Sequence, residues 1–258
     1  MIGEPRVGKT SLLNYISAPS VRQKLYGEYA DSMIFSWIDS HLLGSKFTPE
    51  HFWEYVLKPV QTKIEGQCLD ISLKEKYKFC KNNQFSNFSL ESLFRALGKL
   101  ELSFILLIDE FDALIHHQIL NSVDFFGGLR SLASRSDGAM ALVIASRQAI
   151  HVLNKQTQNL NPTSSPFFNI FKEITLGGFP EKDIAALLKK ASNIFSINDY
   201  QAVRIVAGRH PYLIQVAASA LWDAYEENLL TDYERWMYMG NSINREQDWL
   251  FLDTWRVW

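Results

Sequence analysis

The chain has 258 residues, of which 47% are hydrophobic and 21% are charged, and its formal net charge is −2. This composition is typical of a folded globular protein with room for one large domain, or for a large and a small one. The near-neutral charge gives no bulk attraction to nucleic acid or to acidic membranes. Two cysteines are too few for a disulfide framework, no signal peptide opens the chain, and its apolar runs are too short to cross a bilayer. We therefore expect a cytoplasmic protein without a membrane segment.

A glycine-rich loop is the first predicted element. Residues 3–10 read GEPRVGKT, which fits the phosphate-loop pattern G-x-x-x-x-G-K-[ST] at every fixed position. The glycines let backbone N–H groups approach phosphate oxygens without a Cβ in the way. Lys9 is expected to reach the β- and γ-phosphates, and the Thr10 hydroxyl is expected to bind Mg²⁺. Apolar residues at helical spacing over 11–17 then predict a helix whose positive end faces the anion.

After this helix, segments with the apolar spacing of a strand or helix alternate with a segment that has no such spacing. Residues 32–38 read SMIFSWI, a short strand closed by Asp39, and residues 49–64 have the spacing of an amphipathic helix. The stretch 65–86 is polar and irregular, so no element is predicted there. Helical spacing then resumes near residue 90, with Ser89 as the expected N-cap.

Two later runs are continuously apolar and end in polar residues. Residues 104–108 read FILLI and precede an Asp-Glu pair, whereas residues 141–145 read ALVIA and precede a Ser-Arg pair. Between them, apolar residues at helical spacing over 123–133 predict a crossover helix. Unbroken apolar runs fit strands that are buried on both faces. The order strand, helix, strand therefore predicts an α/β fold with a parallel sheet covered by helices.

The polar residues at the ends of these strands have the chemistry of a phosphoryl-transfer site. A buried strand delivers Asp109 to the sheet edge, where it is placed to hold the magnesium shell. Glu110 is placed to orient or deprotonate an attacking water, whereas Asp112 reads as the charge at a helix N-terminus. Arg147 is placed to sense the γ-phosphate and to stabilise the transition state. Spacing alone equally fits a capping Ser146 followed by a surface arginine.

The pattern changes from α/β to helical in the last third of the chain. Residues 154–166 are polar with two prolines and predict an exposed loop, and residues 174–176 predict one more short strand. From Glu181 onward, apolar stripes predict helices, with Pro211 in the first turn of the third helix. We expect an α/β core over 1–178, a helical lid subdomain over 179–230 and part of a further segment over 231–258.

Several stretches together resemble the STAND branch of the AAA+ P-loop ATPases, and in particular its bacterial and archaeal AAA-like domain proteins. These stretches are GEPRVGKTSLL, LLIDEFDAL, LVIASR, SPFFNIFKEITLGGFPEKDIAALL and GRHPYLIQVAASAL, in this order, and they cover about residues 3–225. The resemblance implies a P-loop NTPase sheet of the additional-strand, catalytic-glutamate type with five parallel strands. It places the loop strand in the centre beside the sensor strand. It also implies a helical lid on the nucleotide, and ATP with Mg²⁺ as the ligand.

The resemblance also assigns site residues. It implies that Asp109 joins Thr10 at the metal, that Glu110 positions the water and that Arg147 is the sensor. In the lid, it implies that Pro211 packs against the adenine, although from the residues alone Pro211 reads equally well as a helix start. The phosphate contacts that it implies come from Gly3, Glu4, Pro5, Arg6, Val7, Gly8, Lys9, Thr10 and Ser11, and the residues beside the adenine are Gly208 and His210.

The chain departs from the family pattern at its start, where only Met1 and Ile2 precede the loop. Members of the family have a strand there, and its loss leaves a gap in the middle of the sheet. Each unpaired buried backbone group costs on the order of 1–3 kcal/mol. We therefore expect the sequence to be a fragment, or to begin too late, and to have reduced ATPase activity.

The leading hypothesis is an ATP-binding regulatory switch with slow magnesium-dependent ATP hydrolysis, acting in signalling or defence as the resemblance implies. Expected partners are ATP and ADP, together with other proteins or further copies of the chain in a nucleotide-dependent association. A second hypothesis is a nucleic-acid-associated, initiator-like ATPase, but residues 226–258 are rich in acidic and aromatic side chains, which argues against it. A third is a non-catalytic scaffold derived from such an ATPase, and the intact Lys9, Thr10, Asp109 and Glu110 count against that.

Overall fold

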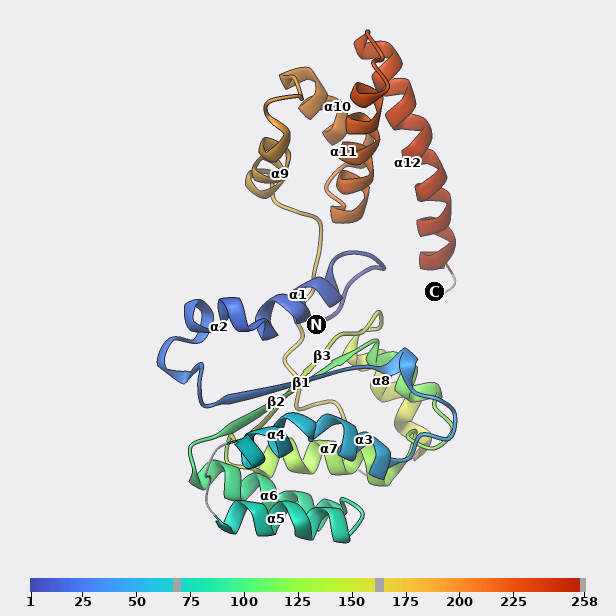
Figure 1. The fold of residues 1–258 in the computed structure, drawn as a ribbon. Helices are drawn as coiled ribbons and strands as arrows, with labels where there is room; N and C mark the ends of the chain where they lie inside the picture. Colours follow the sequence, from blue (N-terminus) through green and yellow to red (C-terminus); the bar gives the residue numbers. More distant parts are fainter. Residues whose placement is uncertain (67–70, 161–164, 256–258) are drawn as a thin grey trace. The chain divides into compact units, whose positions relative to one another are not determined.

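The computed structural model describes residues 1–66, 71–160 and 165–255, the last seven of them as backbone only (Figure 1). The described chain divides into two compact units. The first contains Met1–Ile2 and Thr10–Ile174, and the second contains Gly3–Lys9 together with the chain from Thr175 onward. The glycine-rich loop thus belongs by its contacts to the second unit, while most of the helix that follows it belongs to the first.

A parallel sheet forms the centre of the first unit, as the sequence predicts. Its strands are β1 (Met33–Asp39), β2 (Ser103–Asp109) and β3 (Met140–Ile144), and their spatial order is β1-β2-β3. The register pairs Asp39 with Asp109 and Ile108 with Ile144. Because parallel strands end at the same sheet edge, the polar residues that follow all three strands gather there.

Helices cover both faces of the sheet (Figure 1), and the side chains of β2 alternate between them. Phe104, Leu106 and Ile108 belong to the large core under the face that most of the helices cover. Leu107 lies on the other face and packs with Leu13 of α1 (Lys9–Ser17) in a much smaller cluster. Burial on both faces explains why this strand reads as an unbroken apolar run.

The large core of the first unit is rich in aromatic rings. Phe111 makes an edge-on contact with Phe168 at 5.3 Å between ring centroids, and Phe126 contacts both of these rings. Such edge-to-face pairs add to the stabilisation that apolar burial provides. The helices of this unit are α1, α2 (Pro19–Tyr26), α3 (Pro49–Val56), α4 (Lys58–Gly66), α5 (Ile71–Asn82), α6 (Asn87–Lys99), α7 (Val123–Arg135) and α8 (Ile150–Thr157).

The sheet has three strands within the described residues, not the five that the resemblance implies. Met1 and Ile2 nevertheless lie where the resemblance places the loop strand. Ile2 forms a parallel bridge with Ser146, the Met1 amino group donates to the Ile144 carbonyl at 2.8 Å, and the Ser146 amide donates to the Met1 carbonyl at 3.0 Å. Residues 174–176 form no strand, although the Ile174 carbonyl accepts a hydrogen bond from the Ile2 amide.

The helix predicted over 49–64 is in fact two helices, α3 and α4, which meet at Leu57. Pro59 accounts for the break, because it has no N–H to donate to the carbonyl of Tyr55, four residues earlier, and its ring clashes with that carbonyl. The prediction of one continuous helix was therefore wrong. It recognised the apolar spacing but not the proline within it.

Three further local predictions were wrong. The stretch 65–86, predicted to be irregular, contains α5, whose buried residues Leu73, Tyr77 and Cys80 lie on one face. Ser89 is not an N-cap, because α6 begins two residues earlier and buries this side chain. The predicted exposed loop over 154–166 begins inside α8; its residues 161–164 lie outside the described part of the chain.

The second unit is helical and has its own apolar core. Its helices are α9 (Glu181–Leu188), α10 (Ile197–Ala207), α11 (Pro211–Glu226) and α12 (Asp232–Trp255). Pro211 occupies the first position of α11, as predicted. Core residues from α12 include Met239 and Ile243, so this long helix packs against the others as part of the same core. None of the helices that the structure describes is long and apolar enough to span a membrane.

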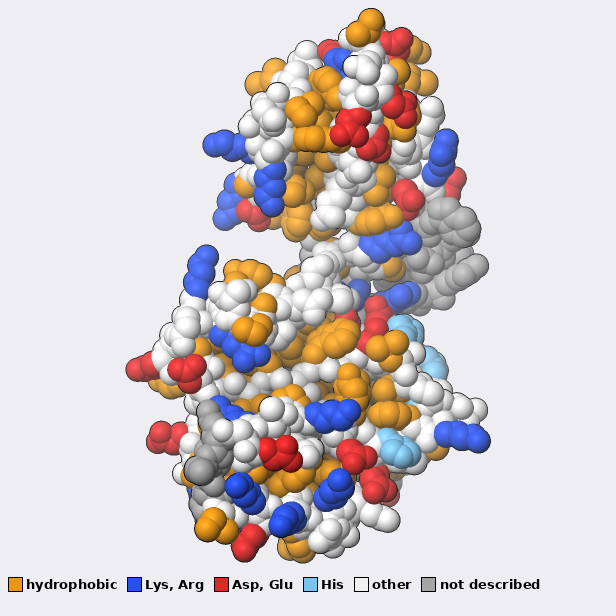
Figure 2. Space-filling view, viewed as in Figure 1, with side chains coloured by type: hydrophobic (Ala, Val, Ile, Leu, Met, Phe, Trp, Pro, Cys, Tyr) orange, Lys and Arg blue, Asp and Glu red, His pale blue; other side chains and the backbone are white. Residues whose placement is uncertain are grey.

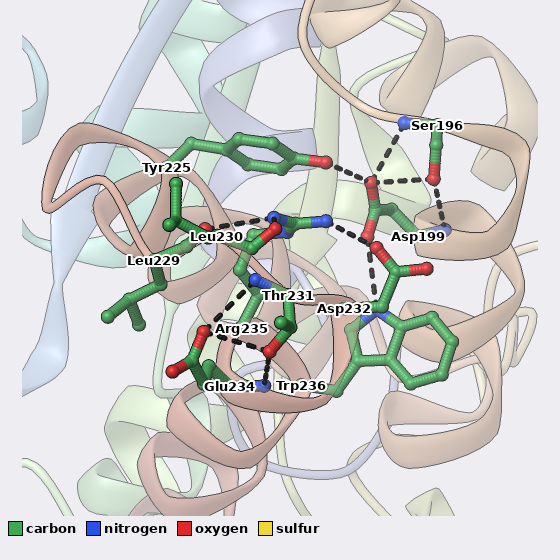
Figure 3. Close-up of polar contacts among 10 residues, drawn as sticks. All are labelled: Ser196, Asp199, Tyr225, Leu229, Leu230, Thr231, Asp232, Glu234, Arg235 and Trp236. Carbon is green, nitrogen blue, oxygen red and sulfur yellow. Dashed lines mark hydrogen bonds and ion pairs between the residues drawn. The ribbon is translucent and has the colours of Figure 1, made fainter.

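A buried carboxylate, Asp199, ties three helices of this unit together (Figure 3). Its two oxygens accept hydrogen bonds from the backbone N–H and hydroxyl of Ser196, from the Tyr225 hydroxyl at 2.6 Å and from the Trp236 indole N–H at 3.0 Å. Arg235 lies beside them, with its guanidinium over the Tyr225 ring and a pair to Asp232. The network thereby fixes the start of α12 against α10 and α11.

We predict that Asp199→Asn lowers the free energy of unfolding by about 2–3 kcal/mol, because an amide offers one acceptor oxygen to donors that now share two. Burial by itself raises the pKa of Asp199, but hydrogen bonds from Tyr225, Trp236 and Ser196 outweigh it and hold the pKa below its usual value. The stability that the ionised Asp199 carboxylate adds to the folded state is therefore complete above the ordinary carboxyl pKa. It disappears as the pH falls through the lower pKa that Asp199 has in the folded protein.

Urea unfolding followed by circular dichroism at several pH values measures this effect. Asp223→Asn is the matched control, because Asp223 is an exposed carboxylate on α11. The difference between the two variants should be full at pH 7 and shrink as the pH falls below about 4. Equal stabilities of the two variants at pH 7 would contradict the role given to the Asp199 network.

Candidate functional site

The hydroxyl of Thr10 donates to Oδ2 of Asp109 across 2.6 Å, although the two residues are 99 positions apart. Thr10 lies in the first turn of α1, and Asp109 is the last residue of β2 and only 2% exposed. The other carboxylate oxygen of Asp109 accepts from the Glu110 amide at 3.0 Å. The fold thus brings together the two residues that the sequence singles out for a metal.

These two side chains supply the oxygen ligands that Mg²⁺ prefers. No group of three or more His, Cys, Asp or Glu side chains in the described residues could enclose a metal ion. Magnesium in phosphoryl-transfer sites is held by one or two protein oxygens, with water and phosphate completing its shell. The donor set of Thr10 and Asp109 therefore fits magnesium held jointly with a phosphate ligand.

Glu110 and Arg147 also lie together, at the carboxyl ends of β2 and β3. Arg147 Nε is 3.3 Å from Glu110 Oε2, and the Arg147 amide donates to Asp112 Oδ1. His41 Nε2 lies 3.8 Å from the same Glu110 oxygen. Glu110 has φ 47°, a left-handed backbone conformation that is strained for a residue with a side chain. The carboxylate is therefore held in one place by cationic and polar neighbours.

Two buried polar atoms at the same sheet edge have no hydrogen-bond partner within the described part of the chain. They are Ser40 Oγ, just after β1, and Gln148 Oε1, shortly after β3. Buried polar groups are nearly always paired in native proteins, so such atoms indicate a place where a ligand or water binds. In parallel α/β sheets, ligands bind at this edge.

Sequence reasoning missed Ser40 and His41, although a signal was present. The polar stretch Asp39-Ser40-His41 follows a predicted strand, just as Asp109-Glu110 and Ser146-Arg147 do. The same rule about polar residues at the carboxyl ends of parallel strands applies to all three. Asp112 also does more than the predicted helix-terminal charge, because it accepts the hydrogen bond from Arg147.

The glycine-rich loop, in the second unit, is folded around its own lysine. Lys9 is 5% exposed, and its ammonium group donates to the carbonyl oxygens of Gly3 at 2.9 Å and Glu4 at 3.0 Å. A Cβ on Gly3 would come within 2.8 Å of the Leu176 carbonyl oxygen, so packing alone favours glycine there. Gly8 has φ 102°, which a residue with a side chain rarely adopts.

The start of α11 lies beside this loop in the same unit. Burial lowers the pKa of His210, against the opposing effects of the Glu4 carboxylate and of a hydrogen bond with the Pro5 backbone. Pro211 is buried at the first position of α11, and Gly208 ends α10 with φ 56°. Their roles as helix start and helix end are thus visible, while contact with an adenine stays a prediction.

Comparison with known proteins agrees with this fold. A family model described as "AAA-like domain" matches residues 2–232. Among solved structures, the Walker-type ATPase PABY2304 of Pyrococcus abyssi is similar with a TM-score of 0.60 and 17% identity, over 99% of this chain and 69% of that one. A search of curated proteins found no significant match.

The ORC2 protein of Aeropyrum pernix is also similar in fold. Its ADP form matches with a TM-score of 0.55 and 11% identity, and its ADPNP–ADP complexes match with 0.57 and 10%. Each covers 94% of this chain but only 61% and 60%, respectively, of ORC2. At these identities the likeness shows a shared fold: an α/β sheet surrounded by helices, as in P-loop ATPases.

Proposed function

The chain belongs to the AAA-like domain family, and we propose that it binds ATP with magnesium, hydrolyses it slowly and acts as a regulatory switch. The observation that carries this proposal is the 2.6 Å hydrogen bond between Thr10 and Asp109. It joins the end of the phosphate-loop motif to the acidic strand end, the two parts that a P-loop ATPase needs at its metal. The ADP and ADPNP forms of the ORC2 structures support an adenine nucleotide as the ligand.

Each residue then has a distinct part in the proposed reaction. The Lys9 ammonium binds the phosphates, together with the backbone N–H groups of residues 3–11 other than Pro5, which has none. Thr10 and Asp109 would hold magnesium, which would supply neutralisation of the phosphate charge. Glu110 orients the attacking water and accepts its proton. Arg147 stabilises the charge that develops on the transferred phosphoryl group.

The contacts of Glu110 support slow hydrolysis. One of its oxygens faces the Arg147 guanidinium at 3.3 Å and the His41 ring at 3.8 Å, so it must leave these two side chains before it can bind and activate water. A base that has to be released spends part of its time inactive, as expected of a switch. The roles in signalling or defence, with protein partners or self-association, rest on the family resemblance stated above.

A nucleic-acid-associated ATPase is the weaker proposal. On the face drawn in Figure 2, Lys and Arg side chains are mixed with Asp and Glu rather than gathered into a basic surface. A basic patch or stripe is the usual electrostatic footprint of nucleic-acid binding. Salt-sensitive binding of duplex DNA by the purified chain would favour this alternative over the regulatory switch.

Calorimetric titration with ATP tests the proposed function. We expect binding in the presence of Mg²⁺ and at least about tenfold weaker binding after chelation, because the metal neutralises the phosphates beside Asp109. Asp109→Asn should remove most of this metal dependence, whereas Asp137→Asn, in an exposed turn before β3, should not. Failure to bind ATP at millimolar concentration would overturn the proposal.

A further inference from the structure

One arginine of the phosphate loop, Arg6, is bound to side chains far along the sequence. Its Nη1 lies 3.2 Å from Glu246 Oε2 on α12, and its guanidinium carbon lies 4.5 Å from the centre of the Tyr212 ring on α11. The Tyr212 hydroxyl donates to the same Glu246 oxygen at 2.5 Å. All three residues belong to the second unit. We call this cluster the Arg6 latch.

The phosphate-loop motif does not require an arginine at position 6, since any residue fits there. Arg6 nevertheless has φ 59°, the left-handed conformation that side chains usually avoid. The strained backbone is accompanied by an ion pair and a cation–π contact, which hold the side chain against α11 and α12. Arg6 therefore connects the loop to helix α12.

The Arg6 side chain can leave Glu246 for another anion, because its ion pair with Glu246 is weak. The side chains of Arg6 and Glu246 are 39% and 35% exposed, and ion pairs with this exposure are weak. A guanidinium pairs with phosphate as well as with carboxylate, and a bidentate pair with phosphate is among the stronger charge-assisted hydrogen bonds. A triphosphate bound at residues 3–10 brings several negative charges to the same loop as Arg6. It can thus compete with Glu246 for the guanidinium.

The polar contacts of helix α12 are more numerous at its start than beyond Ile243. The Asp199 network in Figure 3 anchors Arg235 and Trp236, about 15 Å along the helix from Glu246. Met239 and Ile243 are buried in the core between these points. Beyond Ile243, the latch and a 3.4 Å hydrogen bond from Gln247 to the Val206 carbonyl are the polar contacts seen in the described side chains. Among the described side chains, opening the latch leaves the Gln247 hydrogen bond as the remaining polar contact beyond Ile243, while the start of α12 stays anchored.

Building on the ATP binding proposed above, we propose that Arg6 is a nucleotide-controlled latch on α12. In the structure, Glu246 and Tyr212 hold the Arg6 guanidinium. A triphosphate at the loop takes the guanidinium from Glu246, and the part of α12 that follows Ile243 is then released. Nucleotide binding at the phosphate loop thus makes the end of α12 mobile. Another protein can recognise the released helix end. By linkage, whatever holds α12 in place also weakens nucleotide binding.

The test compares Mg-ATP affinity and amide hydrogen exchange in matched variants. Glu246→Gln removes the competitor for Arg6 and should tighten ATP binding about fivefold, whereas Arg6→Gln should weaken it by a similar factor. Asp248→Asn is the control, because Asp248 is an exposed carboxylate two residues along the same helix. Tyr212→Phe keeps the ring but removes one hydrogen bond to Glu246, so its affinity should lie between those of the wild type and Glu246→Gln.

Hydrogen exchange in peptides covering 244–255 reports the helix end directly. ATP should speed this exchange in the wild-type chain and in Asp248→Asn. In Arg6→Gln and Glu246→Gln the exchange should already be fast without ATP and should not respond to it. ATP binding that leaves α12 exchange unchanged in the wild type would overturn the latch alone. Absence of ATP binding in the wild type would overturn both the latch and the proposed function.

Discussion

Replacing Lys9 by alanine is expected to weaken Mg-ATP binding at least about a hundredfold, which corresponds to about 2.7 kcal/mol of binding free energy. Lys9 is nearly buried within the loop, and its ammonium already spans the carbonyls of Gly3 and Glu4. The cation is thus positioned at low entropic cost for a phosphate at the same loop. Calorimetry at fixed magnesium and salt measures the change.

Two further variants distinguish the loss of the Lys9 charge from a disruption of the loop structure. Lys24→Ala removes an exposed lysine from α2 and should leave the affinity unchanged. Lys9→Met keeps most of the side-chain length without the charge and should bind as weakly as Lys9→Ala. Wild-type affinity in both folded Lys9 variants would show that the motif does not bind phosphate, and a scaffold role would then be favoured.

Glu110→Gln is expected to reduce ATP turnover by about a hundredfold to a thousandfold while ATP still binds. Glutamine keeps the shape of the side chain but cannot accept a proton from water. It also breaks the charge pair with Arg147, so the two effects need to be measured separately. Single-turnover phosphate release reports the chemical step, and calorimetry reports the binding step.

Glu75→Gln serves as the control for turnover, because Glu75 is an exposed residue of α5 and is chemically matched. The difference between the two variants should appear in the rate constant of single turnover and not in ATP affinity. If both variants release phosphate at the wild-type rate, Glu110 is not the base. Asp112, which contacts Arg147, and His41, which contacts Glu110, would then be tested by the same measurement.

The parts of the fold that sequence predicts are those governed by local chemistry. The run FILLI ending in Asp109 shows a doubly buried strand and its terminal acid directly, and the structure places both as expected. Leu73, Tyr77 and Cys80 of α5 were overlooked because charged residues separate them, although they share one helix face. Apolar spacing alone does not predict the break at Pro59, because it takes no account of the missing N–H and the bulky ring of a proline inside a helix.

The residues of the candidate site could be named from the sequence, but their contacts could not. Thr10, Asp109, Glu110 and Arg147 were named from motif and position, and the structure brings Thr10 to Asp109 and Arg147 to Glu110. The pairing of Glu110 with Arg147 depends on the distance between two strand ends, which only the folded sheet sets. The contact of Arg6 with Glu246 spans 240 residues and has no sequence pattern at all.

The two faces of the sheet have apolar cores of unequal size, so one face is more stable against local opening than the other. The helix that carries Thr10 rests on a small cluster around Leu13, Leu107 and Ala145, while the opposite face buries the extensive aromatic core. Local opening free energies follow the apolar contacts that each element makes. The side of the sheet that faces α1 can therefore loosen and re-form while the other side stays intact. A protein built in this way can rearrange one face of its sheet many times without risking the integrity of its fold.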